Sequence, residues 1–304
     1  KDQVIFEGTE VLKQDGTPFK VFTPYKNAWL SRVFDNDSVR TTFSINSSRF
    51  HRSEAVSIPT LQMLGFTRSS IPVPGNIPDI NIISSYDQNR DFPALNGTTR
   101  IGVHLRFGTV SIREMVKLAI QHNATWLNEL IWREFYSAIL QHFPYVIEGA
   151  FNRKYNVIPW INNEKQFEAW CQGKTGYPIV DAGMRELNAT GYMHNRVRMI
   201  TASFLTKHLL VDWRWGEAYF MRKLLDFDLA SNNGGWQWAA GTGTDAQPYF
   251  RVFNPESQAV KFDHNQQYIR KWVPELGTKE YPNPIVDHKM ARERAIETYR
   301  KAVS

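Results

Sequence analysis

The sequence has very little cysteine, no long apolar run and no leader pattern. Its single cysteine, Cys171, excludes an internal disulfide and a cysteine-rich metal site, and fits a reducing, intracellular compartment. No stretch approaches the roughly 20 consecutive apolar residues that a membrane-spanning helix needs. Residues 1–7 lack a basic stretch followed by an apolar one, so no signal peptide is visible. We therefore expect a cytoplasmic protein with no membrane segment.

What the sequence does contain is enough apolar residues for a large core and an excess of basic ones. The 304 residues are 42% hydrophobic and 22% charged, which is ordinary for a globular protein of one or two domains. The formal net charge is +6, and basic residues favour a polyanionic partner because their contacts release condensed counterions. A mildly basic enzyme without such a partner explains the charge equally well.

The residue pattern predicts a mainly helical fold with three parts along the chain. Short strands are expected at 3–6 and 19–23, followed by a helix from Pro24 to Val33, so residues 1–33 suggest a fragment of an α/β domain. Residues 34–95, rich in Ser, Asn and Pro, predict a long connector. The remainder, 96–304, predicts an all-helical domain. Its expected helices lie at about 111–121, 124–142, 164–172, 178–190, 193–209, 214–226, 264–272 and 288–302.

The helix expected at 124–142 carries polar and aromatic residues on one face. Spacings of i, i+3, i+4 and i+7 place together an acid, an indole, a guanidinium and a phenol: Glu129, Trp132, Arg133 and Tyr136. The other side has its own apolar stripe, so packing does not require this face. It suits base stacking, phosphate binding and hydrogen bonding to a base. The alternative is a solvated face with an incidental tryptophan.

Ten tryptophans are present, and two of them, Trp236 and Trp238, follow a run of Asn and Gly beginning at Asn232. An indole can stack on a nucleobase, pack against a flavin or pass an electron. Glycines allow a backbone to approach a flat ligand closely. These features together favour light-driven redox chemistry on a nucleic acid.

Two further segments carry polar groups suited to a base or a cofactor. Asn195, Arg198 and Met199 share one stripe of a helix, where methionine is a polarisable neighbour for an aromatic system. Asp226 and Asp228 precede the paired indoles and suit ribityl hydroxyls. Ordinary surface residues and a helix end explain the two segments about equally well. No second acidic or histidine cluster accompanies the aspartates, so we expect no metal.

A run of small and hydroxyl residues before helical sequence suits an anion, such as a pyrophosphate. It reads Gly97, Thr98, Thr99, Arg100, Ile101 and Gly102. N-capping explains its threonines equally well, and the run is neither a P-loop nor a dinucleotide fingerprint. No nucleophile elbow is present, so a cofactor would have to supply the chemistry.

These segments together resemble the photolyase/cryptochrome family, and the match is close to the bacterial class I cyclobutane pyrimidine dimer photolyases. The resemblance covers essentially the whole chain but begins partway into the family pattern, with most of the N-terminal α/β antenna domain absent. It rests on motifs that start at Tyr86, Gly97, Trp126, Gly173, Met193, Asp226, Asn232 and Phe253.

By this resemblance the chain binds FAD. Its phosphates would be held by Tyr86, Thr98, Thr99, Arg100, Ile101 and Gly102. The flavin and its ribityl chain would be held by Asp226, Phe227 and Asp228, with Arg198 paired to Asp226. Asn232 would face flavin N5, where plant cryptochromes typically carry an acid and insect ones a cysteine. Electrons would reach the flavin along Trp160, Trp213 and Trp236. An antenna chromophore, folate or deazaflavin, is implied only for a protein that includes the antenna domain.

The resemblance also implies DNA that contains cyclobutane pyrimidine dimers as the substrate, and a monomer in the bacterial cytoplasm at the nucleoid. Trp132 and Trp238 would enclose the dimer, while Glu129, Asn195 and Met199 would touch its bases. The remaining DNA contacts would come from Arg90, Arg133, Tyr136, Arg196, Arg251 and Gln258.

The implied reaction is a cycle of electron transfer. Excited reduced FAD gives an electron to the dimer, the cyclobutane ring splits, and the electron returns. Asn195 argues against repair of (6-4) photoproducts, because those enzymes use a second histidine after the one at His194. A cryptochrome-type blue-light photoreceptor and a flavin-free helical nucleic-acid binder remain as alternatives.

Overall fold

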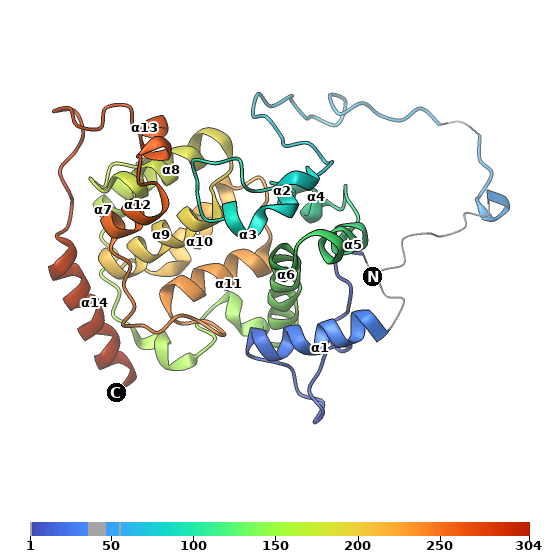
Figure 1. The fold of residues 1–304 in the computed structure, drawn as a ribbon, viewed down its shortest axis with the longest axis horizontal. Helices are drawn as coiled ribbons and strands as arrows, with labels where there is room; N and C mark the ends of the chain where they lie inside the picture. The colour runs from blue at the N-terminus through green and yellow to red at the C-terminus, as the bar shows by residue number, and fades with distance from the viewer. Residues whose placement is uncertain (1, 36–46, 55) are drawn as a thin grey trace.

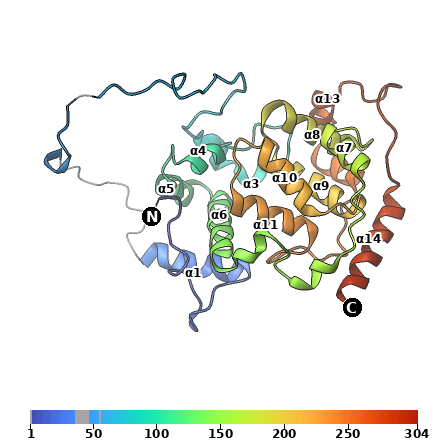
Figure 2. The same cartoon turned by 180° about the vertical axis from the view of Figure 1, so that it is seen from behind.

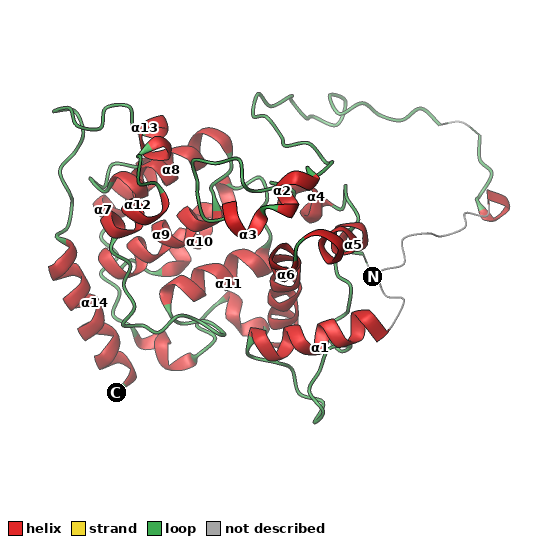
Figure 3. Cartoon of the chain, in the orientation of Figure 1, coloured by secondary structure: helices red, strands yellow, loops and turns green. Residues whose placement is uncertain are grey.

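The computed structural model describes residues 2–35, 47–54 and 56–304, and within them it contains helices and loops but no strand (Figure 3). The mainly helical fold expected from the sequence is therefore confirmed. The α-helices are α1 (Phe22–Asp35), α2 (Ile80–Ser84), α3 (Tyr86–Asn89), α4 (Gly102–Phe107), α5 (Ile112–His122), α6 (Ala124–His142), α7 (Glu164–Gln172), α8 (Pro178–Thr190), α9 (Asn195–Ser203), α10 (Trp213–Lys223), α11 (Leu229–Ala240), α12 (Pro255–Phe262), α13 (Gln267–Trp272) and α14 (His288–Val303). The short helices are η1 (Ser47–Arg49), η2 (Pro144–Ile147), η3 (Arg153–Val157) and η4 (Phe204–His208). No helix among these residues is long and apolar enough to cross a membrane.

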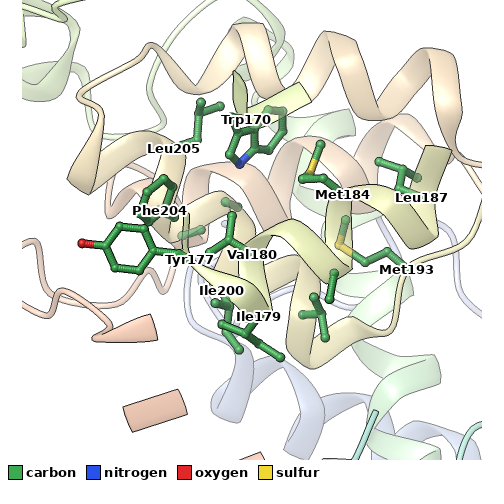
Figure 4. Packing of buried hydrophobic residues seen from close by; sticks show 14 of the residues in the cluster. Trp170, Tyr177, Ile179, Val180, Met184, Leu187, Met193, Ile200, Phe204 and Leu205 are labelled. Atoms are coloured by element: carbon green, nitrogen blue, oxygen red, sulfur yellow. The ribbon is translucent and has the colours of Figure 1, made fainter. Parts of the chain in front are cut away.

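Two large apolar cores lie on either side of the pair α6 and α11 (Figures 1 and 2). The first core joins the N-terminal segment and α1 to α5 and the apolar stripe of α6. The second lies among α7 to α11 and α13, where Trp170, Met184 and Phe204 are fully or almost fully buried (Figure 4). A smaller cluster around Tyr299 fastens α14 to the Ile158 and Leu210 loops.

Two glycines let helices approach α11 and α6 closely. A Cβ built at Gly234 would lie 2.2 Å from Tyr136 on α6, and one at Gly216 would lie 2.1 Å from Trp236. Since real Cβ atoms are not found at such distances, any other residue there would push the helices apart. Glycine is therefore required where α6 meets α11 and where α10 meets α11.

The prediction of two strands at 3–6 and 19–23 is wrong, because neither segment forms a strand. The backbone N–H groups of Ile5 and Phe6 donate to the carboxylate of Glu134 on α6, at 2.7 and 3.0 Å, and not to a neighbouring strand. Both side chains are buried in the first core. The segment is thus irregular chain that is packed against a helix, and it presents no open strand edge.

Most of the expected helices are present, but the Asn- and Gly-rich stretch was not expected to be helical. Residues 229–240 form α11, whose N-cap is Asp228, with its carboxylate accepting from Ser231 N–H at 2.9 Å. The helix expected at 193–209 begins at Asn195 and passes into a turn of π-helix, η4. Within the predicted connector, residues 36–46 and 55 lie outside the described residues, and α2 and α3 are additional short helices that contact α5 and α6.

Candidate functional site

A cavity of about 430 Å³ lies where α6, α9, α10 and α11 converge. Helix α6 contributes the face that the sequence singled out: Glu129, Trp132, Arg133 and Tyr136. Helix α9 contributes Asn195, Arg198, Met199 and Ala202. The segment from Asp226 through α11 contributes Asp226, Phe227, Asp228, Ser231, Asn232, Gly235, Trp236 and Trp238. Three stretches that are distant in sequence therefore meet around one hollow.

The two indoles expected to enclose a substrate, Trp132 and Trp238, line this same cavity. Each is only partly buried, so each presents ring surface to the hollow. Trp132 stacks on Phe22 of α1, with ring centroids 3.8 Å apart and planes 7° from parallel. Stacking of this kind leaves the opposite face of the indole as the one on which a flat ligand can lie.

Asn232 lines the cavity and is held by the helix beside it. Its side-chain amide donates to the backbone oxygen of Glu217 on α10 at 3.2 Å. Asn233 fixes the carboxylate of the same Glu217 at 3.0 Å, and burial raises the pKa of that carboxyl to about 7. The orientation of the Asn232 amide is therefore set by α10.

An arginine–aspartate pair forms the charged end of the cavity. Arg198 Nη2 donates to both carboxylate oxygens of Asp226, at 2.9 and 3.1 Å, which confirms the expected pairing. Arg198 Nε donates to Met193 O at 2.7 Å. Burial opposes the charge of Arg198, but Asp226 outweighs it and keeps the pKa of the guanidinium raised. Gly102 at the start of α4 lies against this pair, since a Cβ there would be 3.2 Å from Asp226 Oδ2.

Two ion pairs cross the rim of the cavity through consecutive residues after α3. Arg90 donates to Glu129 on α6 at 2.6 Å, and Asp91 accepts from Arg196 on α9 at 2.6 Å. Burial raises the pKa of Glu129, and the Arg90 charge opposes that rise. The Arg90–Asp91 dipeptide thereby bridges α6 and α9.

The position of Arg133 on the α6 face suggested contact with a phosphate, but its guanidinium has other partners. Its guanidinium already donates to the backbone oxygens of Gln3 and Leu105, the latter at 3.3 Å. Burial lowers its pKa. Although it lines the cavity, it holds the N-terminal segment, and a contact with phosphate stays a prediction.

The expected phosphate-binding residues lie outside the lining of the cavity. Thr98 Oγ1 is hydrogen-bonded to Tyr192 Oη at 3.1 Å, and the Arg100 guanidinium lies 4.6 Å from the same ring. Ile101 is buried in the first core, so only its backbone can serve a ligand. Tyr86 packs against Arg90 at 5.2 Å, and Thr99 is partly buried. Through Gly102 the run still reaches the Asp226 end of the cavity.

Among the expected DNA contacts, Arg251 and Gln258 also lie away from the cavity lining. Arg251 is exposed, with its guanidinium 5.5 Å from the Phe253 ring, and Gln258 is partly buried on α12. Arg196 lies over the Phe262 ring at 4.3 Å. Their place outside the hollow suits contact with a backbone and not with a base.

The three tryptophans expected to carry electrons belong to one core but differ in exposure. Trp236 lines the cavity and is 2% exposed, Trp213 is 2% exposed, and Trp160 is partly exposed at the edge of the core. Trp236 touches the rings of Phe220 and Trp170, at 5.0 and 6.0 Å. Trp236 and Trp213 are equally buried, so exposure does not order them, and the relay stays a prediction.

Several lining residues escaped the sequence argument. Ser231 and Gly235 fall three and seven positions after Asp228, so helical spacing would have placed them in the site had α11 been recognised. Phe22 does not line the cavity but stacks on Trp132, and it carries no such signal because it precedes Trp132 by 110 positions. Within the described ranges no group of three or more His, Cys, Asp or Glu suits a metal ion.

Comparisons with known proteins agree with this site. Residues 126–279 match the model of the FAD binding domain of DNA photolyase. The chain is 42% identical, over 99% of its length and 72% of the relative, to the deoxyribodipyrimidine photo-lyase of Escherichia coli. Its fold matches a class III photolyase from Agrobacterium tumefaciens with a TM-score of 0.84 and 34% identity, over 99% of this chain and 72% of that one. A cryptochrome from Synechocystis matches with a TM-score of 0.77 and 25% identity, over 97% and 70%. The residues that the family model matches include most of the cavity lining. The chain therefore belongs to the DNA photolyase family and carries its FAD-binding domain.

Proposed function

We propose that this protein splits cyclobutane pyrimidine dimers in DNA in a light-driven reaction. The observation that carries the proposal is that Trp132 and Trp238 line one cavity together with Asn232, Glu129 and Asn195. Two indoles at a hollow can stack on the two bases of an extruded dimer, and extrusion of the target base is a general property of photolyases. The relatives named deoxyribodipyrimidine photo-lyase support the same substrate.

The residues of the cavity fit FAD. Arg198, Asp226 and Asp228 provide a charged end, and Asn232 provides an oriented amide. Gly235 is exposed in the cavity wall and a Cβ built on it meets no atom within 4 Å, which leaves room for a flat ring against the backbone of α11. When bound and reduced, FAD supplies a light-excited electron donor. Arg198 and Asp226 would hold its chain, and the run from Thr98 to Gly102 would approach its phosphates.

The chain's own residues would hold the lesion and keep water out. Glu129 would accept a hydrogen bond from a base N–H, and this bond is stronger when the carboxyl is ionised, which Arg90 favours. Asn195 would bond a base edge, and Met199 would provide polarisable contact. A hydrogen bond in a cavity of low dielectric is stronger than in water. Asn195, where a histidine would be expected for (6-4) repair, supports dimers as the substrate.

Basic residues around the mouth suit the DNA backbone. Arg196 and Arg251 lie outside the hollow and would meet phosphates on either side of the extruded bases. We propose a monomer as the active form. We also propose that Trp160, Trp213 and Trp236 reduce the flavin by passing electrons inward.

The test compares Trp132→Ala with Trp213→Phe in protein reconstituted with FAD. Light-limited repair of an oligonucleotide with a single thymine dimer should fall at least tenfold in Trp132→Ala, with FAD content unchanged. Trp213→Phe is the matched control, because it removes a buried indole outside the cavity and should spare repair when the flavin is reduced chemically. Unchanged repair in Trp132→Ala would refute the assigned pocket.

A blue-light photoreceptor is the second candidate, and the fold match to a Synechocystis cryptochrome favours it. The same oligonucleotide separates the two functions. If the protein binds FAD and responds to light but leaves the dimer intact with chemically reduced flavin, signalling is the function. Splitting of the dimer excludes that alternative as the sole function.

A further inference from the structure

One wall of the cavity is held in place by a residue from the far end of the chain. Phe22 lies flat on the Trp132 indole, with ring centroids 3.8 Å apart and an angle of 7° between the rings. Trp132 is also in edge contact with Phe135 at 5.6 Å and in tilted contact with Tyr136 at 5.4 Å. Phe22 is the only one of these three rings that covers a face of the indole.

Phe22 is itself fixed by hydrogen bonds to another loop. It is 7% exposed and begins α1. Its backbone N–H donates to Asp245 Oδ2 at 3.0 Å, and the nearby Lys20 O accepts from Thr244 Oγ1 at 2.7 Å. The start of α1 is therefore attached to the loop that follows α11, the helix that carries Trp238.

The middle of α1 is attached to α6 by a buried acid. Trp29 Nε1 donates to Glu134 Oε1 at 2.7 Å, and Glu134 also accepts from Ile5 and Phe6 N–H. Glu134 lies two residues after Trp132 on the same helix. A shift of α1 against α6 would break the buried hydrogen bond from Trp29 to Glu134, and this contact keeps Phe22 in place over the indole.

We propose that Phe22 is a positioning residue that acts through Trp132. An indole at the edge of a cavity would otherwise sample several side-chain rotamers. By closing one face, Phe22 selects the ring orientation that offers the other face to a pyrimidine. This inference rests on the proposed function in one respect, the identity of the ligand that stacks on the exposed face of Trp132. The packing itself concerns Phe22 and Trp132 alone.

The first test is binding of a thymine-dimer oligonucleotide. An aromatic stack is worth roughly 0.5–1.5 kcal/mol beyond area burial, so Phe22→Leu should weaken binding by roughly 2- to 12-fold. Phe22→Tyr retains the ring and should restore binding. Tyr25→Leu is the matched control, because Tyr25 is an equally buried ring of α1 that contacts Phe135 at 5.2 Å. In a Trp132→Ala background Phe22→Leu should have no further effect on binding, whereas equal losses in both backgrounds would overturn the proposal.

The second test does not depend on any substrate. In protein labelled with 5-fluorotryptophan, Trp132→Phe identifies the fluorine resonance of Trp132. That resonance should shift and broaden in Phe22→Leu and stay in place in Tyr25→Leu. If it does so while the wild-type protein ignores dimers, the proposed function fails and the positioning role stands. If the resonance is unmoved in Phe22→Leu, the positioning role fails whatever the substrate is.

Discussion

The most informative single change is Gly235→Ala, because it separates the folding of the chain from the fit of its cofactor. Gly235 lies in α11 and in the cavity wall. A Cβ built on it meets no atom within 4 Å. The neighbouring Gly234 has the same helical backbone, but its Cβ would lie 2.2 Å from the Tyr136 ring. Two adjacent glycines of one helix thus face opposite environments.

The two substitutions should change stability in opposite directions in the absence of FAD. Alanine is favoured over glycine inside a helix by about 0.5–1 kcal/mol, and Gly235→Ala should gain this amount because nothing opposes the methyl group. Gly234→Ala has the same helical gain but must displace an aromatic ring. Overpacking of that kind costs about 1–3 kcal/mol, so the net effect should be a loss of stability.

Gly235→Ala should weaken the binding of FAD even though it stabilises the protein without FAD. If the flavin lies against α11, the added methyl group occupies its space, and an overpacked contact of about 1–3 kcal/mol corresponds to binding weakened roughly 5- to 150-fold. Urea unfolding without FAD, followed by titration with FAD monitored by flavin fluorescence, measures both quantities on the same samples.

The outcome that would refute this reasoning is a Gly235→Ala protein that is more stable without FAD yet binds FAD as tightly as the wild type. The flavin would then lie elsewhere in the cavity. A Gly235→Ala protein that is less stable without FAD would contradict the open space beside α11. Gly216→Ala, whose Cβ would lie 2.1 Å from Trp236, serves as a second overpacked control.

Two further predictions concern charged and titrating groups. Burial raises the pKa of Glu129, and the charge of Arg90 opposes that rise, so Arg90→Gln should raise this pKa further. In a pH profile of dimer binding, the variant should lose affinity at a higher pH than the wild type as the solution is acidified. His208 is buried and its pKa is lowered to about 3, so between pH 6.5 and 3 the unfolded chain binds a proton that the folded chain does not. Its contribution to the free energy of unfolding should fall by about 1.4 kcal/mol per pH unit on acidification below 6.5. Urea unfolding at pH 6.5 and 5 should show a smaller decline in His208→Asn, and an equal decline would contradict the assignment.

Local sequence was sufficient to predict α6 and the side of it that lines the cavity. Helical spacing alone places Glu129, Trp132 and Tyr136 on one side, and a helix of 19 residues leaves no other arrangement. The same spacing rule failed at α11, because Asn and Gly have low helix propensity. There the close approach of Gly234 to Tyr136 requires glycine, and the tertiary contacts of α11 outweigh the low propensity.

The N-terminal segment was mispredicted for a different physical reason. The apolar residues at 3–6 and 19–23, on either side of the turn at Asp15 and Gly16, suit strands, but a strand needs a neighbour to accept its backbone hydrogen bonds. Here Glu134 accepts the N–H groups of Ile5 and Phe6, and no sequence pattern links groups 128 or more positions apart. The stack of Phe22 on Trp132 was invisible from the sequence for the same reason.

Helix α6 connects the two halves of the molecule because its two acids have different neighbours. Glu134 faces the N-terminal segment, where three N–H groups donate to it, although burial still raises its pKa to about 7. Glu129 lies on the cavity side and is balanced by Arg90. The two acids lie five positions apart on one helix, so the contacts of the N-terminal segment and those of the cavity meet on α6. By its contacts, the segment 2–35 is part of the structure that shapes the cavity.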